Sequence, residues 1–169
     1  MTSSALKLAT ERAGEALLRR GWLVATSESC TGGAMAHQLT EIGGSSAWFE
    51  RGFVTYSNIA KIELLGVSPD ILAEYGAVSR ETALAMVQGT LERSRADVAI
   101  AVTGIAGPSG GSPGKPVGTI WFGFAVRGEA PQIELQQFDG DRQAVREAAT
   151  VYALSRLAEL AEEPPSHLA

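Results

Sequence analysis

Two patterns of apolar residues alternate along this chain. One is the spacing typical of helices, and the other is the short continuous run typical of buried strands. The helical spacing is clearest in residues 79–95, where Leu84, Val87 and Leu91 share one face. Short apolar runs such as residues 96–104 have the length and composition of buried strands. The expected helices span residues 3–20, 31–42, 59–66, 68–76, 79–95 and 141–163. The expected strands span residues 22–26, 49–57, 96–104, 119–128 and 133–140.

The order of these elements predicts the fold class. Helices and strands interleave, which is typical of an α/β protein whose helices cover a mixed, mostly parallel sheet. The two strands that flank residues 128–131 form an expected hairpin, so the sheet cannot be wholly parallel. Because no repeat or linker interrupts the pattern, we expect one domain over residues 1–163 and a disordered tail over residues 164–169.

Composition and charge narrow the possible functions. The 169 residues carry a net charge of -5, which argues against non-specific binding to nucleic acid or to an anionic membrane. No apolar run approaches the roughly 20 residues that span a bilayer, and the N-terminus lacks the apolar core of a signal peptide. One cysteine excludes an internal disulfide framework, and two histidines are too few for a histidine-based metal site. A cytoplasmic protein fits these observations.

A hydroxyl-rich turn, TSESCTGGAMA at residues 26–36, joins the first expected strand to a helix and holds the only cysteine. Ligands bind at this position in α/β proteins, and free N–H groups at a helix start can hold an anion or an oxyanion. Gly32 and Gly33 carry no Cβ that would block a ligand. The ordinary alternative is a helix cap formed by Ser29 or Thr31.

A second polar group, YSNIAK at residues 56–61, follows the second expected strand. Tyr56 ends that strand, Asn58 is the expected N-cap of the next helix, and Lys61 lies in the first helical turn. If both turns share one sheet edge, Lys61 lies near the hydroxyl-rich turn. Burial lowers the pKa of a lysine, so that it can act as a base. The alternative is a solvated helix lysine.

A long loop over residues 105–118 follows the apolar strand that ends near Thr103. It is rich in glycine and proline, and no Gly-Lys-Ser/Thr sequence opens a helix there, which excludes a P-loop. Its N–H groups and hydroxyls could still hold a phosphate, or the loop could act as a lid.

Two arginines near the start of the last helix form the fourth candidate group. Arg142 and Arg146 are four positions apart, so they are expected on one helix face, where they could bind a phosphate or carboxylate together. The alternative is surface pairing with the nearby acids Asp139, Asp141 and Glu147.

The choice of nucleophile rests on which base the chain can supply. A cysteine hydrolase normally needs a histidine, and neither His37 nor His167 is suitably placed. A helix dipole could lower the pKa of Cys30, or Cys30 could simply be a packing residue. A serine with a lysine base requires nothing that the chain lacks, which favours Ser29 with Lys61.

Five stretches in this order resemble the CinA C-terminal domain family: ESCTGG, GSSAWFERGFVTYSNIAK, GAVS, TGIAGPSGGSPGKPVGTIWFGFA and GDRQAVR. The resemblance runs from about residue 5 to residue 160 and is strongest for the stand-alone, PncC-type nicotinamide-nucleotide amidohydrolases. It implies a three-layer α/β/α sandwich that forms a homodimer or higher assembly. The N-terminal domain of larger family members is not expected in this sequence.

The resemblance also implies an activity, the hydrolysis of nicotinamide mononucleotide to nicotinic acid mononucleotide and ammonia in pyridine-nucleotide recycling, without metal or cofactor. The family's serine, tyrosine and lysine correspond to Ser29, Tyr56 and Lys61. The expected oxyanion donors are N–H groups of the turn, at Cys30, Thr31, Gly32 and Gly33. The residues expected to hold the substrate are Glu28, Asn58, Thr103, Gly104, Gly107, Ser109, Gly110, Arg142 and Arg146. Whether Glu28 takes part in catalysis or only orients the turn stays open.

Two other functions remain open from the sequence. One is a nucleotide-binding or regulatory module of the same family with little or no catalysis. The other is an amidase that uses Cys30 as its nucleophile.

Overall fold

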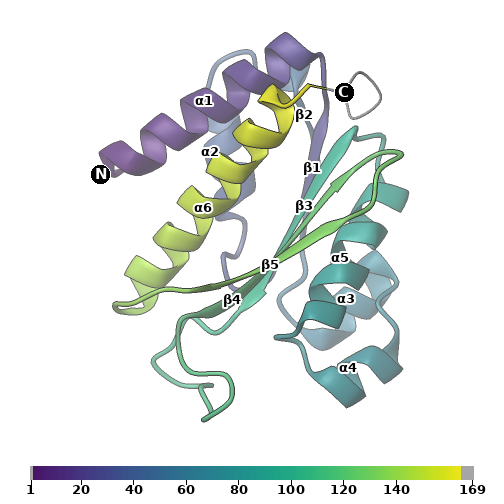
Figure 1. Cartoon of the computed structure of the whole chain (residues 1–169), viewed down its shortest axis with the longest axis vertical. Coiled ribbons are helices and arrows are strands. Elements are labelled where there is room, and N and C mark those ends of the chain that lie inside the picture. Colours follow the sequence, from purple (N-terminus) through teal and green to yellow (C-terminus); the bar gives the residue numbers. More distant parts are fainter. Residues whose placement is uncertain (1, 165–169) are drawn as a thin grey trace.

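The structure, a computed structural model, describes residues 2–164, so residues 165–169 of the predicted disordered tail lie outside the described residues. Five strands form one sheet in the order β2-β1-β3-β4-β5 (Figure 1). The strands are β1 Val24–Glu28, β2 Phe49–Val54, β3 Val98–Gly104, β4 Thr119–Val126 and β5 Gln132–Gln137. The helices are α1 Ser4–Arg20, α2 Ala34–Glu41, α3 Asn58–Leu65, α4 Pro69–Tyr75, α5 Arg80–Glu92 and α6 Arg142–Glu162, with a short 3-10 turn at Ser45–Ala47.

The sheet is mixed and mostly parallel, as the sequence predicted. Strand β1 pairs in parallel with β2 on one side and with β3 on the other. Strand β4 pairs antiparallel with both β3 and β5, so β5 runs in the same direction as β1, β2 and β3. The carboxyl ends of β1, β2 and β3 therefore meet at one edge of the sheet, where α/β proteins place their ligands.

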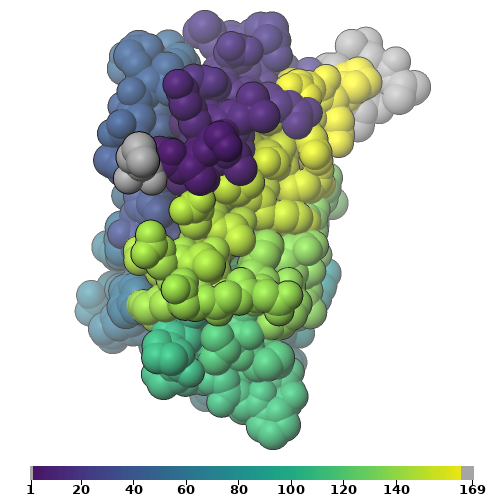
Figure 2. Space-filling view, turned by 90° about the vertical axis from the view of Figure 1, so that its left-hand side faces the viewer, coloured from purple at the N-terminus to yellow at the C-terminus, as the bar shows by residue number. Residues whose placement is uncertain are grey.

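Two apolar cores, one on each face of the sheet, make the fold a three-layer α/β/α sandwich. Helices α1, α2 and α6 cover one face, where Leu17 and Leu154 pack with Phe122 of β4. Helices α3, α4 and α5 cover the other face, where Leu65 and Met86 lie against small residues of the sheet. In the space-filling view α1 and α6 lie side by side, and the loop of residues 105–118 forms the end of the molecule below them (Figure 2).

Several predicted boundaries were wrong by a few residues at the polar turns. Strand β1 runs to Glu28 and not to Thr26, because Ser27 and Glu28 still pair with both neighbouring strands. The predicted helix at 31–42 begins only at Ala34. Strand β2 ends at Val54, three residues earlier than predicted.

The N-cap of α3 was also predicted wrongly. The side chain of Ser57, and not that of Asn58, accepts the N–H of Ala60. Two other helix starts have typical first residues: Pro69 occupies the first position of α4, and the Ser79 hydroxyl accepts the N–H of Thr82 at the start of α5. Within residues 2–164, no helix combines the length and the apolar character needed to cross a membrane.

Candidate active site

Ser29 is the first residue after β1, at the sheet edge where the parallel strands end. Its N–H donates to the Val102 carbonyl at 3.0 Å, which continues the pairing with β3. The Gly32 N–H then donates to the Ser29 carbonyl at 3.1 Å and closes a tight turn. Gly32 and Gly33 have φ angles of 61° and 100°, the left-handed region in which a side chain would strain the backbone. The glycine pair therefore shapes the turn that presents Ser29.

Lys61 lies directly beside Ser29. Its Nζ is 3.0 Å from Ser29 Oγ and donates to the Thr55 carbonyl at 2.9 Å. Lys61 is only 1% exposed, so the prediction of proximity is confirmed and the alternative of a solvated helix lysine is wrong. Burial lowers the pKa of the Lys61 ammonium group, because the charged form loses its hydration. In its neutral form this amine can accept the Ser29 hydroxyl proton.

Ser29 and Lys61 line a cavity of about 240 Å³ at the same sheet edge. The cavity brings together residues from all four polar groups that the sequence analysis singled out. Its lining residues are Ser29, Cys30, Tyr56, Asn58, Lys61, Ala77, Val78, Thr103, Gly104, Ile105, Ala106, Gly107, Ser109, Gly110 and Arg142. Five predicted site residues do not line it: Glu28, Thr31, Gly32, Gly33 and Arg146.

Tyr56 stands at the mouth of the cavity and is 60% exposed. Its hydroxyl accepts a hydrogen bond from Arg142 Nη2 at 2.9 Å, and Arg142 Nη1 donates to the Gly107 carbonyl at 2.9 Å. Arg142 therefore links the turn after β2 to the loop of residues 105–118. The hydrogen bonds of Lys61 go to Ser29 and Thr55 and not to Tyr56, so in this structure Tyr56 is no part of the Ser29–Lys61 contact.

Glu28 lies on the opposite side of the turn, only 1% exposed. Its carboxylate accepts the Thr31 hydroxyl at 2.7 Å and the N–H groups of Met35 and Ala36 at 2.9 and 3.0 Å. The carboxylate thus occupies the start of α2, where a negative charge is favoured by the helix dipole. The prediction that this helix start offers free N–H groups to a ligand was therefore wrong for Met35 and Ala36. Glu28 orients the turn and does not reach the cavity.

Arg146 is directed away from Arg142. Its Nε donates to the Cys30 carbonyl at 3.0 Å and its Nη2 donates to the Thr31 carbonyl at 3.1 Å. The expectation that both arginines converge on one ligand was wrong, because only Arg142 lines the cavity. Within residues 2–164 neither arginine forms an ion pair, so the surface pairing considered from the sequence is also wrong.

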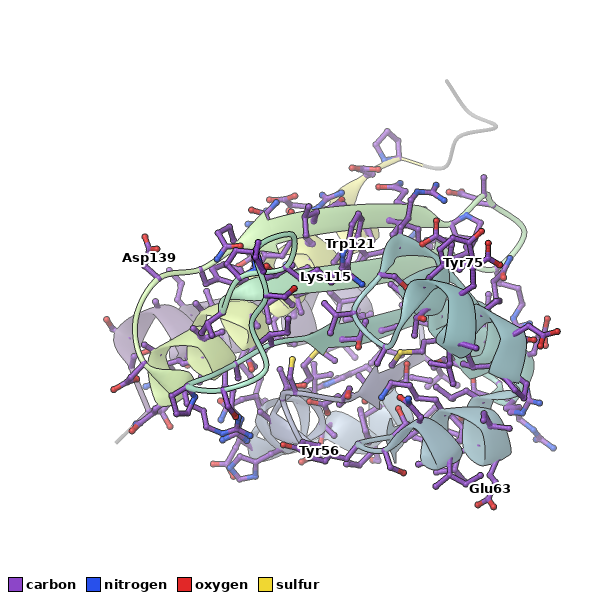
Figure 3. The ribbon with its side chains drawn as sticks, turned by 90° about the horizontal axis from the view of Figure 1, so that it is seen from below. Tyr56, Glu63, Tyr75, Lys115, Trp121 and Asp139 are labelled. Atoms are coloured by element: carbon purple, nitrogen blue, oxygen red, sulfur yellow. The ribbon has the colours of Figure 1, made fainter. Side chains whose placement is uncertain are left out.

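The loop of residues 105–118 forms one wall of the cavity and is tied down at a second point. Lys115 Nζ donates to the Tyr75 carbonyl at 2.8 Å, which fixes the loop to the end of α4 (Figure 3). Thr103 Oγ1 donates to the Ala77 carbonyl at 2.7 Å, which joins the end of β3 to the segment before α5. Ala77 and Val78 are lining residues that the residue-level reasoning missed. Their only signal was the GAVS stretch, to which no role was given.

Burial sets the character of Cys30. The thiol is 7% exposed and packs in the core beneath α2 and α6. Burial raises the pKa of the Cys30 thiol to about 12, so the sulfur stays protonated and is a poor nucleophile. This observation favours Ser29 over Cys30 as the reactive group of the turn.

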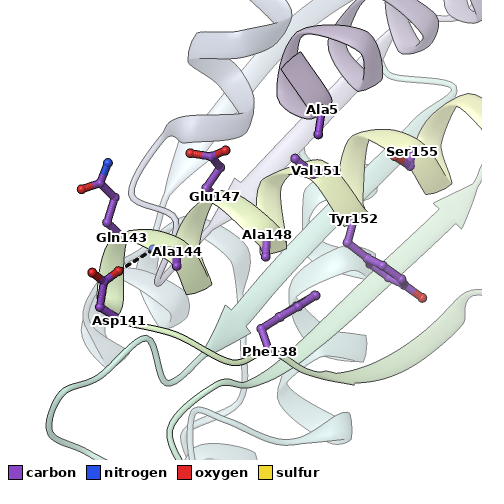
Figure 4. A pocket seen from close by; sticks show the side chains of 10 residues that line it. All are labelled: Ala5, Phe138, Asp141, Gln143, Ala144, Glu147, Ala148, Val151, Tyr152 and Ser155. Atoms are coloured by element: carbon purple, nitrogen blue, oxygen red, sulfur yellow. Dashed lines mark hydrogen bonds between the residues drawn. The ribbon is translucent and has the colours of Figure 1, made fainter. Parts of the chain in front are cut away.

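A larger hollow of about 710 Å³ lies elsewhere, along the outer face of α6 (Figure 4). Ala148, Val151, Tyr152 and Phe138 give it an apolar floor. It shares no residue with the Ser29 cavity and brings no nucleophile beside a base. In residues 2–164 there is also no cluster of three or more His, Cys, Asp or Glu side chains that could hold a metal ion. The chemistry of a hydrolase is therefore concentrated in the smaller cavity.

The model of the family described as the CinA C-terminal domain matches residues 7–161. The chain belongs to the CinA C-terminal domain family. This membership confirms the resemblance predicted from the five sequence stretches. The solved structure of the competence/damage inducible protein CihA from Agrobacterium tumefaciens superposes on this CinA domain with a TM-score of 0.91 and 45% identity. The superposition covers 95% of this chain and 98% of the CihA chain.

Curated relatives of this CinA domain carry an enzyme name. The nicotinamide-nucleotide amidohydrolase PncC of Escherichia coli strain K12 is 54% identical over 158 residues, or 93% of this chain and 95% of that protein. The protein of the same name from Pseudomonas putida is 50% identical over 154 residues, or 90% of this chain and 94% of that protein.

Proposed function

We propose that this chain is a nicotinamide-nucleotide amidohydrolase, which converts nicotinamide mononucleotide to nicotinic acid mononucleotide and ammonia and so recycles pyridine nucleotides. The observation that carries the proposal is the 3.0 Å contact between Lys61 Nζ and Ser29 Oγ inside a cavity. Relatives that are named for this activity match nearly the whole chain. A serine beside a buried lysine is sufficient for amide hydrolysis by an acyl-enzyme route.

In the first half of the reaction Ser29 Oγ attacks the carboxamide carbon while neutral Lys61 accepts the hydroxyl proton. The tetrahedral intermediate collapses, the C–N bond breaks, and the Lys61 ammonium supplies the proton with which ammonia leaves. In the second half a water molecule gives a proton to Lys61 and attacks the acyl carbon. The ester C–O bond to Ser29 then breaks, and the Lys61 ammonium returns the proton to Ser29 Oγ, which releases the carboxylic acid product and regenerates Ser29 and neutral Lys61. The Thr55 carbonyl keeps Nζ beside Oγ throughout. Tyr56 closes the mouth and can position the leaving group.

Backbone N–H groups of the turn are the candidate donors to the oxyanion. The Ser29 and Gly32 N–H groups are already bonded to the Val102 and Ser29 carbonyls. Of the other expected donors, Cys30, Thr31 and Gly33, only Cys30 lines the cavity, so the Cys30 N–H is the donor that we propose. Loss of one such donor typically costs about 3–4 kcal/mol of transition-state stabilisation.

The size of the cavity suggests how the substrate lies. At about 240 Å³ it is smaller than most sites for whole ligands. We therefore place the nicotinamide ring and ribose inside, with the 5′-phosphate at the mouth beside Arg142 and the N–H groups of the 105–118 loop. A protein of net charge -5 needs such a local positive charge to bind an anion.

Arg142→Gln is expected to raise the KM for nicotinamide mononucleotide about tenfold or more, because the substitution removes a charge-assisted contact to the phosphate. Initial rates over a range of substrate concentrations measure this effect. The KM of Arg142→Lys, which keeps the charge but not the planar guanidinium group, should lie between the KM of Arg142→Gln and that of the wild type. An unchanged KM in Arg142→Gln would remove Arg142 from phosphate binding.

Cys30→Ala is expected to retain activity within about threefold of wild type, because the protonated thiol is no nucleophile. Ammonia release by the purified variant checks this expectation. Loss of activity in Cys30→Ala, combined with an active Ser29→Ala, would establish the cysteine amidase instead.

The proposed activity itself is tested with the purified chain and nicotinamide mononucleotide in the presence of a metal chelator. Equal amounts of ammonia and nicotinic acid mononucleotide are expected. Calorimetric binding of the nucleotide without any product after long incubation would establish the regulatory module instead. The expected homo-oligomer, the cytoplasmic location, and the lack of cofactor, nucleic-acid and membrane partners stay predictions.

A further inference from the structure

The turn that presents Ser29 is bound by one positively charged side chain, that of Arg146. Arg146 reaches from α6 and donates to two successive carbonyls, those of Cys30 at 3.0 Å and Thr31 at 3.1 Å. These are the residues that immediately follow Ser29. Arg146 itself does not line the cavity, whereas Arg142, one helical turn earlier, does.

Arginine suits this contact because its guanidinium is planar and always charged, with donors at fixed angles. Two parallel N–H···O bonds fix the orientation of both carbonyls, and therefore of both peptide planes. Arg146 packs directly against Gly32, since a Cβ at this position would lie in ordinary contact with Arg146 Nη2, at 3.4 Å. No acidic side chain in residues 2–164 forms an ion pair with Arg146, so no carboxylate competes with these carbonyls for its N–H groups.

Fixing these carbonyls has a consequence for the opposite ends of the same peptides. The peptide that carries the Cys30 carbonyl also carries the Thr31 N–H and directly follows the Ser29–Cys30 peptide, whose N–H is the proposed oxyanion donor. A cation bound to a carbonyl oxygen polarises the peptide and strengthens its N–H as a donor. The second peptide carries the Gly32 N–H, which closes the turn onto the Ser29 carbonyl.

We propose that Arg146 is a positioning residue for catalysis, which orients and polarises the turn after Ser29 and makes no contact with the substrate phosphate. Glu28 complements it, because it holds Thr31 and the start of α2 from the other side. The inference rests on the proposed function for its reaction, but it concerns a different step from the phosphate binding assigned to Arg142. The two arginines of one helix face then divide the work: Arg142 acts on binding and Arg146 acts on turnover.

The matched variants Arg146→Gln and Arg142→Gln separate these roles, with nicotinamide mononucleotide and nicotinamide riboside as substrates. Arg146→Gln is expected to lower kcat about 100-fold with little change in KM, since misplaced donors cost this much. The ratio of kcat/KM for the two substrates should stay at its wild-type value. Arg142→Gln should raise KM for the nucleotide and reduce that ratio. Glu147→Gln, at the next position on α6, is the control that should keep wild-type kcat and KM.

Chemical rescue distinguishes a positioning role from general damage to the fold. Arg146→Ala should regain part of its kcat when guanidinium ion is added far below the unfolding transition, while the wild type should not gain. Arg146→Lys should retain more activity than Arg146→Gln. A raised KM and a reduced substrate ratio in Arg146→Gln would make Arg146 a phosphate ligand and overturn the proposal, as would an unchanged kcat.

A failure of the proposed function would give a different pattern. If the wild type releases no ammonia from the nucleotide, the rate at which a fluorophosphonate labels Ser29 replaces turnover as the readout. That labelling should slow in Arg146→Gln and not in Arg142→Gln. Equal labelling of the wild type and both variants would overturn the role of Arg146, and no labelling of the wild type would refute both the reactive serine and this inference.

Discussion

Ser29→Ala is expected to reduce ammonia release from nicotinamide mononucleotide by about 10⁴-fold or more, because it removes the proposed nucleophile of the acyl-enzyme step. Substrate binding should persist, since the proposed phosphate contact through Arg142 is untouched. Discontinuous ammonia assays at high enzyme concentration measure the residual rate. Calorimetry with the inactive variant measures binding.

The chain offers a matched control for this variant. Ser27 lies two residues earlier, within β1, fully buried, and its Oγ has no hydrogen-bond partner within residues 2–164. Ser27→Ala is expected to keep activity within about threefold and to fold as well as wild type, because no bonded hydroxyl is lost. Wild-type activity in Ser29→Ala would rule out the serine mechanism, whatever the control shows.

Lys61→Met is expected to reduce turnover about 10³- to 10⁴-fold, because it removes the general base while nearly conserving volume in a buried position. The pH dependence of kcat/KM in the wild type should show the ionisation of Lys61. Since burial lowers the pKa of Lys61, kcat/KM should rise with pH through a value below the ordinary lysine range and then level off. In Lys61→Met this ionisation should disappear from the residual activity.

The same residue should link stability to pH. A lysine with a lowered pKa binds fewer protons in the folded state than in the unfolded state, so its destabilising effect is greatest at low pH and fades as pH rises toward the ordinary lysine pKa. Denaturant unfolding at several pH values should therefore show Lys61→Met gaining stability relative to wild type as the pH is lowered. A difference that grows instead with rising pH would contradict burial of an ionisable amine at this position.

Much of the architecture was predictable because apolar periodicity reports directly on burial. The apolar strand β3 and the amphipathic helix α5 were located to within three residues at each end. The end of strand β1 was predicted two residues too early because Ser27 and Glu28 are polar, and polarity normally indicates exposure. Glu28 is buried only because Thr31 and two helix N–H groups neutralise the cost of burying its carboxylate. These partners lie only three to eight residues later, but they meet the carboxylate only once the turn has folded.

The sequence predicted which residues form the candidate site better than it predicted how they are arranged. Ser29 and Lys61 could be paired because parallel strands bring their carboxyl ends to one edge. Helical spacing predicted that Arg142 and Arg146 act together, yet Arg142 binds the Gly107 carbonyl and Arg146 binds the Cys30 carbonyl. Helical spacing sets where a side chain leaves the helix, whereas the carbonyl acceptors within its reach determine where its guanidinium group lies. The bond between Tyr56 and Arg142 joins residues 86 positions apart, and no sequence pattern reports it.

The most direct test of the account is the mass of the enzyme quenched in acid during its first turnovers of nicotinamide mononucleotide. The account predicts an adduct equal in mass to the substrate less ammonia, and peptide mapping should place it on Ser29 within residues 26–36. The adduct should be absent from Ser29→Ala and should accumulate most slowly in Lys61→Met. An adduct on Cys30, or on any residue other than Ser29, would contradict the account.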